Sequence, residues 1–149
     1  MSDDFFGYGG AERREAPRTL LADLTGEEWE KFISFAARRS YPPGATVVET
    51  GSREAALVLI ASGRLRVQAP DAAAATRAEG EMVGLLSFLD GAPSDITVSV
   101  AGPDAAELLL LTPDALQRLA AWKPRIAIAL LRDLGANVAA RLRRLQPGD

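Results

Sequence analysis

The chain has 149 residues, of which 48% are apolar and 25% are charged, and its formal net charge is −3. These values are typical of one globular domain and exclude a largely disordered chain, and the acidic balance does not favour nucleic-acid binding. The absence of cysteine and histidine excludes disulfides, thiolate nucleophiles and the usual ligands of transition metals. We therefore expect no catalytic residues, no metal site, no cofactor and no enzyme activity.

The N-terminal residues 1–18 are predicted to form a mobile tail, since glycines are mixed with charged residues there. Its three aromatic residues, Phe5, Phe6 and Tyr8, either lie loosely on the body of the protein or dock on a partner. Residues 19–149 are predicted to form one domain. An acidic start and the lack of an uncharged apolar run of about 18–20 residues predict a cytoplasmic protein without a membrane partner.

A helix is predicted after Thr25, because Thr25 and Glu28 have the spacing of a capping box. Its apolar residues recur at helical spacing, and Arg38 and Arg39 are expected near its end, where cations suit the helix dipole. The proline and glycine residues at 42–44 then predict a turn.

Short β-strands are predicted beyond residue 45, because apolar residues alternate or form short runs between turn signals. The alanine-rich connector 70–76 predicts only a shortened, irregular hairpin, since alanine is a poor strand former. The predicted strands lie at 47–48, 56–60, 65–67, 95–100 and 107–111.

The stretch 80–98 contains the candidate functional site. Gly80 and Gly84 bracket its start, and a short apolar helix is predicted before the strand at 95–100. A glycine turn that leads into a helix presents backbone N–H groups to an anion. No lysine or arginine lies between Gly80 and Val98, so this stretch offers an anion no cationic side chain.

Two helices are predicted near the C-terminus. Thr112 and Pro113 are residue types preferred at the N-cap and first position of a helix. In that helix Leu116, Leu119 and Trp122 are expected to face inward. Pro124 separates it from a last helix over 125–145, whose apolar residues form one stripe: Ile126, Leu130, Leu131, Leu134, Val138, Leu142 and Leu145.

The order of these segments resembles the cyclic-nucleotide-binding domain family over residues 19–146. The resemblance rests on the glycine-bounded strand 43–51, on the strand–glycine–strand segment 57–67, and on Gly80-Glu81-Met82-Val83-Gly84, which matches the glycine pair before the family's phosphate-binding cassette. The implied fold is mainly β with flanking helices. It would be a β-roll or jelly roll of about eight short strands, with an N-terminal helix and two C-terminal helices.

Two positions depart from the pattern of this family. Leu85 stands where the family has a glutamate that binds the ribose 2′-hydroxyl. Ser94, or Asp95 with a one-residue slip, stands where the family has an arginine that pairs with the cyclic phosphate. A charge-assisted hydrogen bond contributes roughly 1.5–3 kcal/mol, so losing both predicts binding weaker by about two to four decades.

The candidate ligand-binding residues of this degenerate cassette are Gly84, Leu85, Leu86, Ser87, Ser94, Asp95 and Thr97. In the preferred interpretation, the apolar side chains of residues 85–89 fill the former pocket and cyclic nucleotide is no longer a ligand. In the alternative, backbone amides and the Ser87, Ser94 or Thr97 hydroxyls still hold an anion. Four arginines would lend charge in that case, although we expect them on solvated strand faces: Arg53, Arg64, Arg66 and Arg77.

The apolar stripe of the last helix predicts a homodimer, because such a face must be covered and the family's equivalent helix commonly forms a dimer seam. The alternative is a monomer whose helix folds back on its own strands. Arg141, Arg143 and Arg144 form a basic patch, expected to be a solvated helix end rather than a contact for phosphate or an acidic partner. The predicted seam residues are Leu131, Leu134, Val138, Leu142 and Leu145. All of them except Leu142 follow an approximate a/d pattern, which Arg141 interrupts at the next d position.

Three functions remain open. The preferred one is a stand-alone regulatory or interaction module with a degenerate nucleotide site, which acts on an unknown protein partner. The second is a sensor that still binds a cyclic nucleotide or another small anion. The third is a truncated or partner-dependent transcription regulator; a helix-turn-helix is expected to be absent, because the chain stops at Asp149, so direct DNA binding is not expected.

Overall fold

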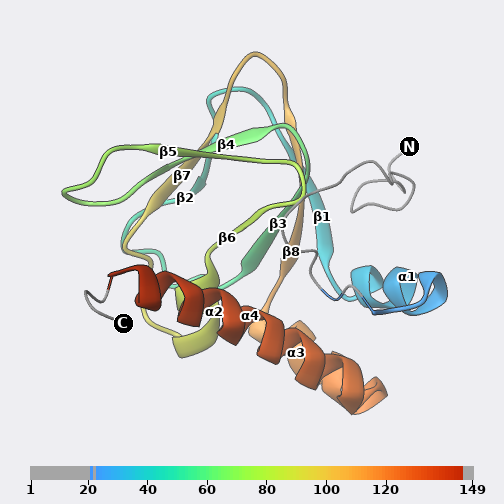
Figure 1. Ribbon diagram of the computed structural model, residues 1–149. Helices are drawn as coiled ribbons and strands as arrows, with labels where there is room; N and C mark the ends of the chain where they lie inside the picture. Colours follow the sequence, from blue (N-terminus) through green and yellow to red (C-terminus); the bar gives the residue numbers. More distant parts are fainter. Residues whose placement is uncertain (1–20, 22, 146–149) are drawn as a thin grey trace.

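The computed structural model describes residue 21 and residues 23–145, which form two antiparallel four-stranded sheets flanked by helices (Figure 1). The sheets have the strand orders β1-β8-β3-β6 and β2-β7-β4-β5. The predicted β-roll with one N-terminal helix and two C-terminal helices is confirmed. The elements are α1 (Gly26–Ser34), β1 (Ala37–Tyr41), β2 (Thr46–Val48), β3 (Leu57–Ser62), β4 (Arg64–Gln68), β5 (Ala75–Ala78), β6 (Met82–Val83), α2 (Leu85–Asp90), β7 (Thr97–Ala101), β8 (Ala106–Leu111), α3 (Pro113–Trp122) and α4 (Pro124–Leu145).

The predicted tail of residues 1–18, with its aromatic residues, lies outside the described residues. No helix in the described part of the chain is both long enough and apolar enough to cross a membrane. The boundaries of the predicted domain at 19–149 stay a prediction.

Strand β3 contributes to two apolar cores, one on each of its faces. Leu57 and Leu59 pack on the helix side, in a cluster that also contains Phe32 of α1. Val58 and Ile60 pack between the two sheets, opposite Val98 of β7. A strand that is buried on both faces has a continuous apolar run rather than an alternating one, which accounts for the uninterrupted segment in the sequence.

Helix α1 begins at the predicted capping box. The Glu28 backbone N–H donates to Thr25 Oγ1, and the Thr25 N–H donates to the Glu28 carboxylate, both at 3.1 Å. The helix ends at Ser34, so the expectation that Arg38 and Arg39 lie near its end is wrong. Both arginines belong to β1, where backbone pairing with β8 replaces helical hydrogen bonds.

The hairpin β4–β5 is more regular than predicted. Four consecutive residues of each strand pair in register, from Arg64 opposite Ala78 to Val67 opposite Ala75. The alanines weaken side-chain packing but leave the backbone donors and acceptors free to pair. Because β5 lies at the edge of its sheet, it needs a partner on one side only.

Helix α3 begins as predicted, since Thr112 Oγ1 accepts a hydrogen bond from the Ala115 N–H at 3.1 Å. Leu119 is fully buried and Leu116 is partly buried. Trp122 was predicted to face inward, yet 37% of it is exposed. It lies beside Phe35, with ring centroids 5.9 Å apart, and the Lys31 ammonium group stands 5.7 Å from the Trp122 ring centre.

The predicted stripe of α4 is divided between two faces. Leu134 is fully buried in the helix-side core together with Ile126 and Leu130, so its assignment to a dimer seam is wrong. Val138 is partly buried against the same core. Leu131, Leu142 and Leu145 are exposed, because they lie on the side of the helix that faces away from the domain.

Candidate functional site

Gly84 forms the turn between β6 and α2 and has a φ of +84°. A Cβ atom at this position would lie 2.7 Å from the carbonyl oxygen of Ala56, which precedes β3. Gly80 also has a positive φ, +87°, but a Cβ there would meet nothing within 4 Å. Position 84 therefore requires glycine for two reasons, backbone conformation and space.

The six-residue helix α2 places its leucines on two sides. Leu85 is 3% exposed and packs with Phe88 in the helix-side core. Leu86, in contrast, is 49% exposed, and Leu89 is exposed as well. Two of the four predicted side chains, Leu86 and Leu89, are thus exposed rather than buried, and the filling of the pocket stays a prediction. The structure keeps a cavity in front of the helix.

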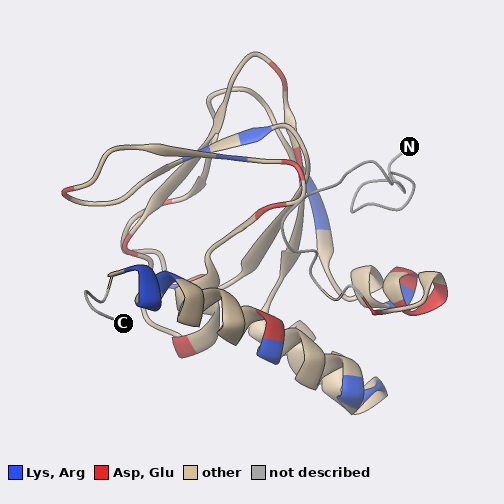
Figure 2. Ribbon diagram, in the orientation of Figure 1, with Lys and Arg blue, Asp and Glu red and all other residues tan. Residues whose placement is uncertain are grey.

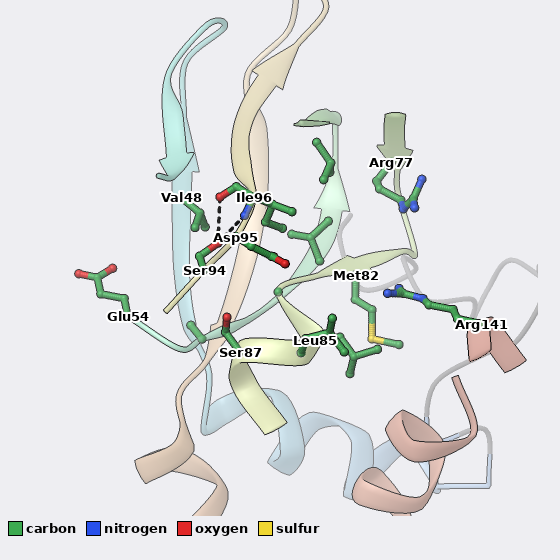
Figure 3. A pocket seen from close by; sticks show the side chains of 15 residues that line it. Val48, Glu54, Arg77, Met82, Leu85, Ser87, Ser94, Asp95, Ile96 and Arg141 are labelled. Carbon is green, nitrogen blue, oxygen red and sulfur yellow. Dashed lines mark hydrogen bonds between the residues drawn. The ribbon is translucent and has the colours of Figure 1, made fainter. Parts of the chain in front are cut away.

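This cavity has a volume of about 120 Å³ and lies between the β6–α2 turn, the segment before β7, and the end of α4 (Figure 3). Six of the seven predicted site residues line it: Gly84, Leu85, Leu86, Ser87, Ser94 and Asp95. Val48, Val67, Met82 and Ile96 supply apolar wall. Its size is below the roughly 300–1,000 Å³ of pockets that hold drug-sized ligands, so it suits a compact ligand.

Ser94 is held by four hydrogen bonds. Its hydroxyl donates to the Ile96 carbonyl oxygen at 2.8 Å and accepts from the Ile96 N–H at 3.1 Å. Its backbone N–H donates to the Ser52 carbonyl at 2.8 Å, and its own carbonyl accepts from the Gly51 N–H at 2.7 Å. The side chain is buried and serves the local turn. An incoming ligand would therefore have to break an existing bond to use it.

Thr97, the seventh predicted residue, is not among the residues that line the cavity. Its hydroxyl lies 2.8 Å from that of Thr50 and accepts a hydrogen bond from the Thr50 N–H at 3.2 Å. Asp95 is exposed, and its carboxylate points into the cavity from the side of β7 (Figure 3). Binding of an anion by the amides of the β6–α2 turn stays a prediction.

Two arginines join the site, of which only Arg77 was named from the sequence as a possible source of charge. Arg77 comes from β5 and Arg141 from the penultimate turn of α4, and both line the cavity. The sequence assigned both to solvated surfaces. Partial burial lowers the pKa of the Arg141 guanidinium below its usual range, and the positive charges of Arg77 and Arg144 lower that pKa further.

The fold and this cavity define the class of the protein: a β-roll domain with a small cavity between a glycine turn and the C-terminal helix. The model of the cyclic nucleotide-binding domain matches residues 38–121. The chain therefore belongs to the cyclic-nucleotide-binding domain family, and the resemblance seen in the sequence is confirmed.

The relatives agree with this assignment. The cyclic AMP receptor protein of Thermus thermophilus is 30% identical over 129 residues, which cover 83% of this chain and 57% of that protein. The crystal structure of the catabolite activator protein from the same organism superposes with a TM-score of 0.71 at 30% identity, over 85% of this chain and 59% of that one. A cyclic nucleotide-binding domain from Methylobacillus flagellatus has a TM-score of 0.73 at 25% identity, over 84% of this chain and 72% of that one. The chain thus spans less than two thirds of the length of its Thermus relative.

Proposed function

We propose that this domain is a cytoplasmic, non-enzymatic regulatory module that has lost tight binding of cyclic nucleotides and acts through protein contacts. One observation carries the proposal: at the position of the family's phosphate-binding arginine, the Ser94 hydroxyl both donates to and accepts from Ile96. A serine in this state offers a phosphate neither a positive charge nor a free donor.

The position of the ribose-binding glutamate supports the same conclusion. Leu85 is buried in the helix-side core, where it packs with Phe88 and offers no hydrogen bond to a ribose hydroxyl. Asp95, the alternative position for the arginine, brings a negative charge to the cavity. Like charges repel, so this carboxylate weakens the binding of a cyclic phosphate further.

Calorimetric titration of the protein with cyclic AMP and with cyclic GMP tests the loss of binding. We expect dissociation constants in the millimolar range or weaker, since about two to four decades of affinity depend on the two missing side chains. A micromolar constant for either nucleotide would overturn the proposal.

We further propose that the exposed face of α4 is the contact surface, and that a second copy of the chain is its partner. Leu131 is 40% exposed and Leu145 is 77% exposed, and Leu142 lies between them on the same side of the helix. Exposed leucines at roughly heptad spacing are typical of a helix that packs on another helix. The assignment of a dimer uses only these three residues, because Leu134 is buried in the core.

Sedimentation equilibrium of the protein tests the dimer. A concentration-dependent mass that approaches twice that of the chain supports it. A monomer at all concentrations up to the millimolar range would contradict the homodimer and would leave a different protein as the partner to be sought.

A further inference from the structure

Arg77 and Arg141 both line the cavity. Both side chains lie on the same side of the cavity, and the Arg141 side chain reaches towards Met82 (Figure 3). Arg77 donates to the neighbouring carbonyl oxygen of Thr76 at 3.2 Å. Within residues 21 and 23–145, neither arginine takes part in an ion pair.

This arrangement concentrates positive charge. Both side chains are half-buried, so water compensates their charges less well than at an open surface. Basic residues also lie on β4 and at the C-terminal end of α4 (Figure 2). Burial lowers the pKa of the Arg141 guanidinium, and the positive charge of Arg77 lowers that pKa further. An anion between them would remove this repulsion.

The opposite side of the cavity has a different character. Asp95 and Ser87 line it there, and the Asp95 carboxylate is an acceptor that makes no ion pair within the described residues. A ligand that fits both sides has an anionic group at one end and a hydrogen-bond donor at the other. The volume of about 120 Å³ restricts it to a compact molecule.

We propose that the cavity binds a small organic phosphate monoester, with its phosphate between Arg77 and Arg141 and a hydroxyl group donating to Asp95. A guanidinium binds two phosphate oxygens with parallel N–H groups, and two guanidiniums match the double charge of a monoester better than the single charge of a cyclic diester. The phosphate would lie at the two arginines and not at Ser94, and the proposal goes beyond the proposed loss of cyclic-nucleotide binding without depending on it.

Titration with inorganic phosphate and with glycerol 3-phosphate tests the site, by calorimetry on the whole chain at low ionic strength. We expect glycerol 3-phosphate to bind more tightly than inorganic phosphate. Arg77→Gln and Arg141→Gln should each lower the affinity for glycerol 3-phosphate about 10- to 150-fold, because each removes a charge-assisted hydrogen bond. Circular dichroism establishes that each variant is folded.

Arg143→Gln is the matched control, because Arg143 is exposed on the same helix and does not line the cavity. It should change the affinity less than twofold. An equal loss in all three variants would mean a diffuse surface effect and would overturn the site. The absence of binding to the wild-type chain at millimolar phosphate and glycerol 3-phosphate would overturn it as well.

Asp95→Asn separates the two ends of the ligand. The variant removes a repelling charge, so inorganic phosphate should bind several-fold more tightly. The affinity for glycerol 3-phosphate should increase several-fold less than the affinity for inorganic phosphate, because a neutral amide is a weaker acceptor for its hydroxyl. If the affinity for both ligands increases by the same factor, the contact between the hydroxyl group and Asp95 is refuted. Tight binding of cyclic AMP, in contrast, would overturn the proposed function and not this site.

Discussion

Ser94 and Ile96 bond to each other in both directions, through the Ser94 hydroxyl and the two backbone polar groups of Ile96, at 2.8 and 3.1 Å. This pair closes the turn that leads from α2 into β7. The hydroxyl is thus a structural group, and its removal should affect stability before it affects any ligand.

Ser94→Ala should lower the free energy of unfolding by about 1–3 kcal/mol, because the part-buried polar groups of Ile96 lose their partner. Urea denaturation measures this loss. Ser99→Ala is the control, since Ser99 is half-buried on β7 and makes no side-chain hydrogen bond within the described residues, and it should cost less. Equal losses in the two variants would show that the Ser94–Ile96 pair contributes nothing specific.

Gly84→Ala should destabilise the protein more than Gly80→Ala. Both substitutions force alanine into a positive φ, which costs roughly 1–2 kcal/mol. Only at position 84 does the new Cβ also meet a backbone oxygen, that of Ala56, at 2.7 Å. The difference between the two melting temperatures isolates this steric contact. Identical melting temperatures would show that the turn moves away from β3 without cost.

Leu85→Glu introduces the residue type that the resemblance to the family implies at this position, yet it should not confer binding of cyclic nucleotides. The glutamate would enter the helix-side core, where Leu85 is buried, and burial of an unpaired carboxylate costs several kcal/mol. Leu86→Glu is the matched control on the exposed side of α2 and should stay within about 0.5 kcal/mol of the wild type. Chemical denaturation compares them; a stable Leu85→Glu variant would contradict the packing.

Leu134→Ala and Leu131→Ala should separate folding from association. Leu134 is fully buried, so its truncation should cost about 2–5 kcal/mol of unfolding free energy. Leu131 is exposed, and its truncation should leave the monomer almost as stable while it weakens the dimer. Denaturation and sedimentation together distinguish the effects. A dimer unchanged by Leu131→Ala would exclude this face as the seam.

Glu28 should make stability depend on pH at the acidic end. The Thr25 N–H lowers the pKa of its carboxylate, a smaller desolvation effect raises that pKa, and the ion pairs with Arg125 and Lys123 lower it again. A lowered pKa in the folded state stabilises the protein above the unfolded value of about 4.3, and this contribution is lost as the pH falls through the folded pKa.

The difference in stability between the wild type and Glu28→Gln should therefore be constant from pH 8 to about pH 5 and should shrink below that range. Thermal denaturation at a series of pH values measures it. Glu30→Gln is the control, because Glu30 is exposed on the same helix and makes no ion pair in the described part of the chain. A difference that grows on acidification would reverse the assigned sign.

The local features of the fold could be predicted because neighbouring residues determine them. The capping box at Thr25, the Thr112–Pro113 helix start and the buried run of β3 all follow from short-range patterns. The placement of Arg38 and Arg39 could not be predicted, since β1 exists only through its pairing with β8, about 70 residues further along the chain in this antiparallel register.

The glycine turn at the candidate site was predicted from the sequence, whereas of its two arginines only Arg77 was named as a possible source of charge. Gly84 and the residues around it lie where the glycine pattern indicated. Arg77 and Arg141 belong to an edge strand and to the last helix, and only tertiary packing brings them to one cavity. Tertiary packing also divides the apolar stripe of α4 into buried Leu134 and exposed Leu131. The periodicity of a sequence identifies the apolar face of a helix, but it does not identify what packs against that face.

Arg141 and Leu142 are consecutive residues of α4, one at the cavity and one on the exposed leucine face. If ligand binding at Arg141 shifts this helix and thereby changes self-association, the linkage is reciprocal: a ligand that strengthens self-association by some factor is itself bound more tightly by the same factor in the associated form. The amount of protein in the cell would then set the threshold at which the ligand is sensed.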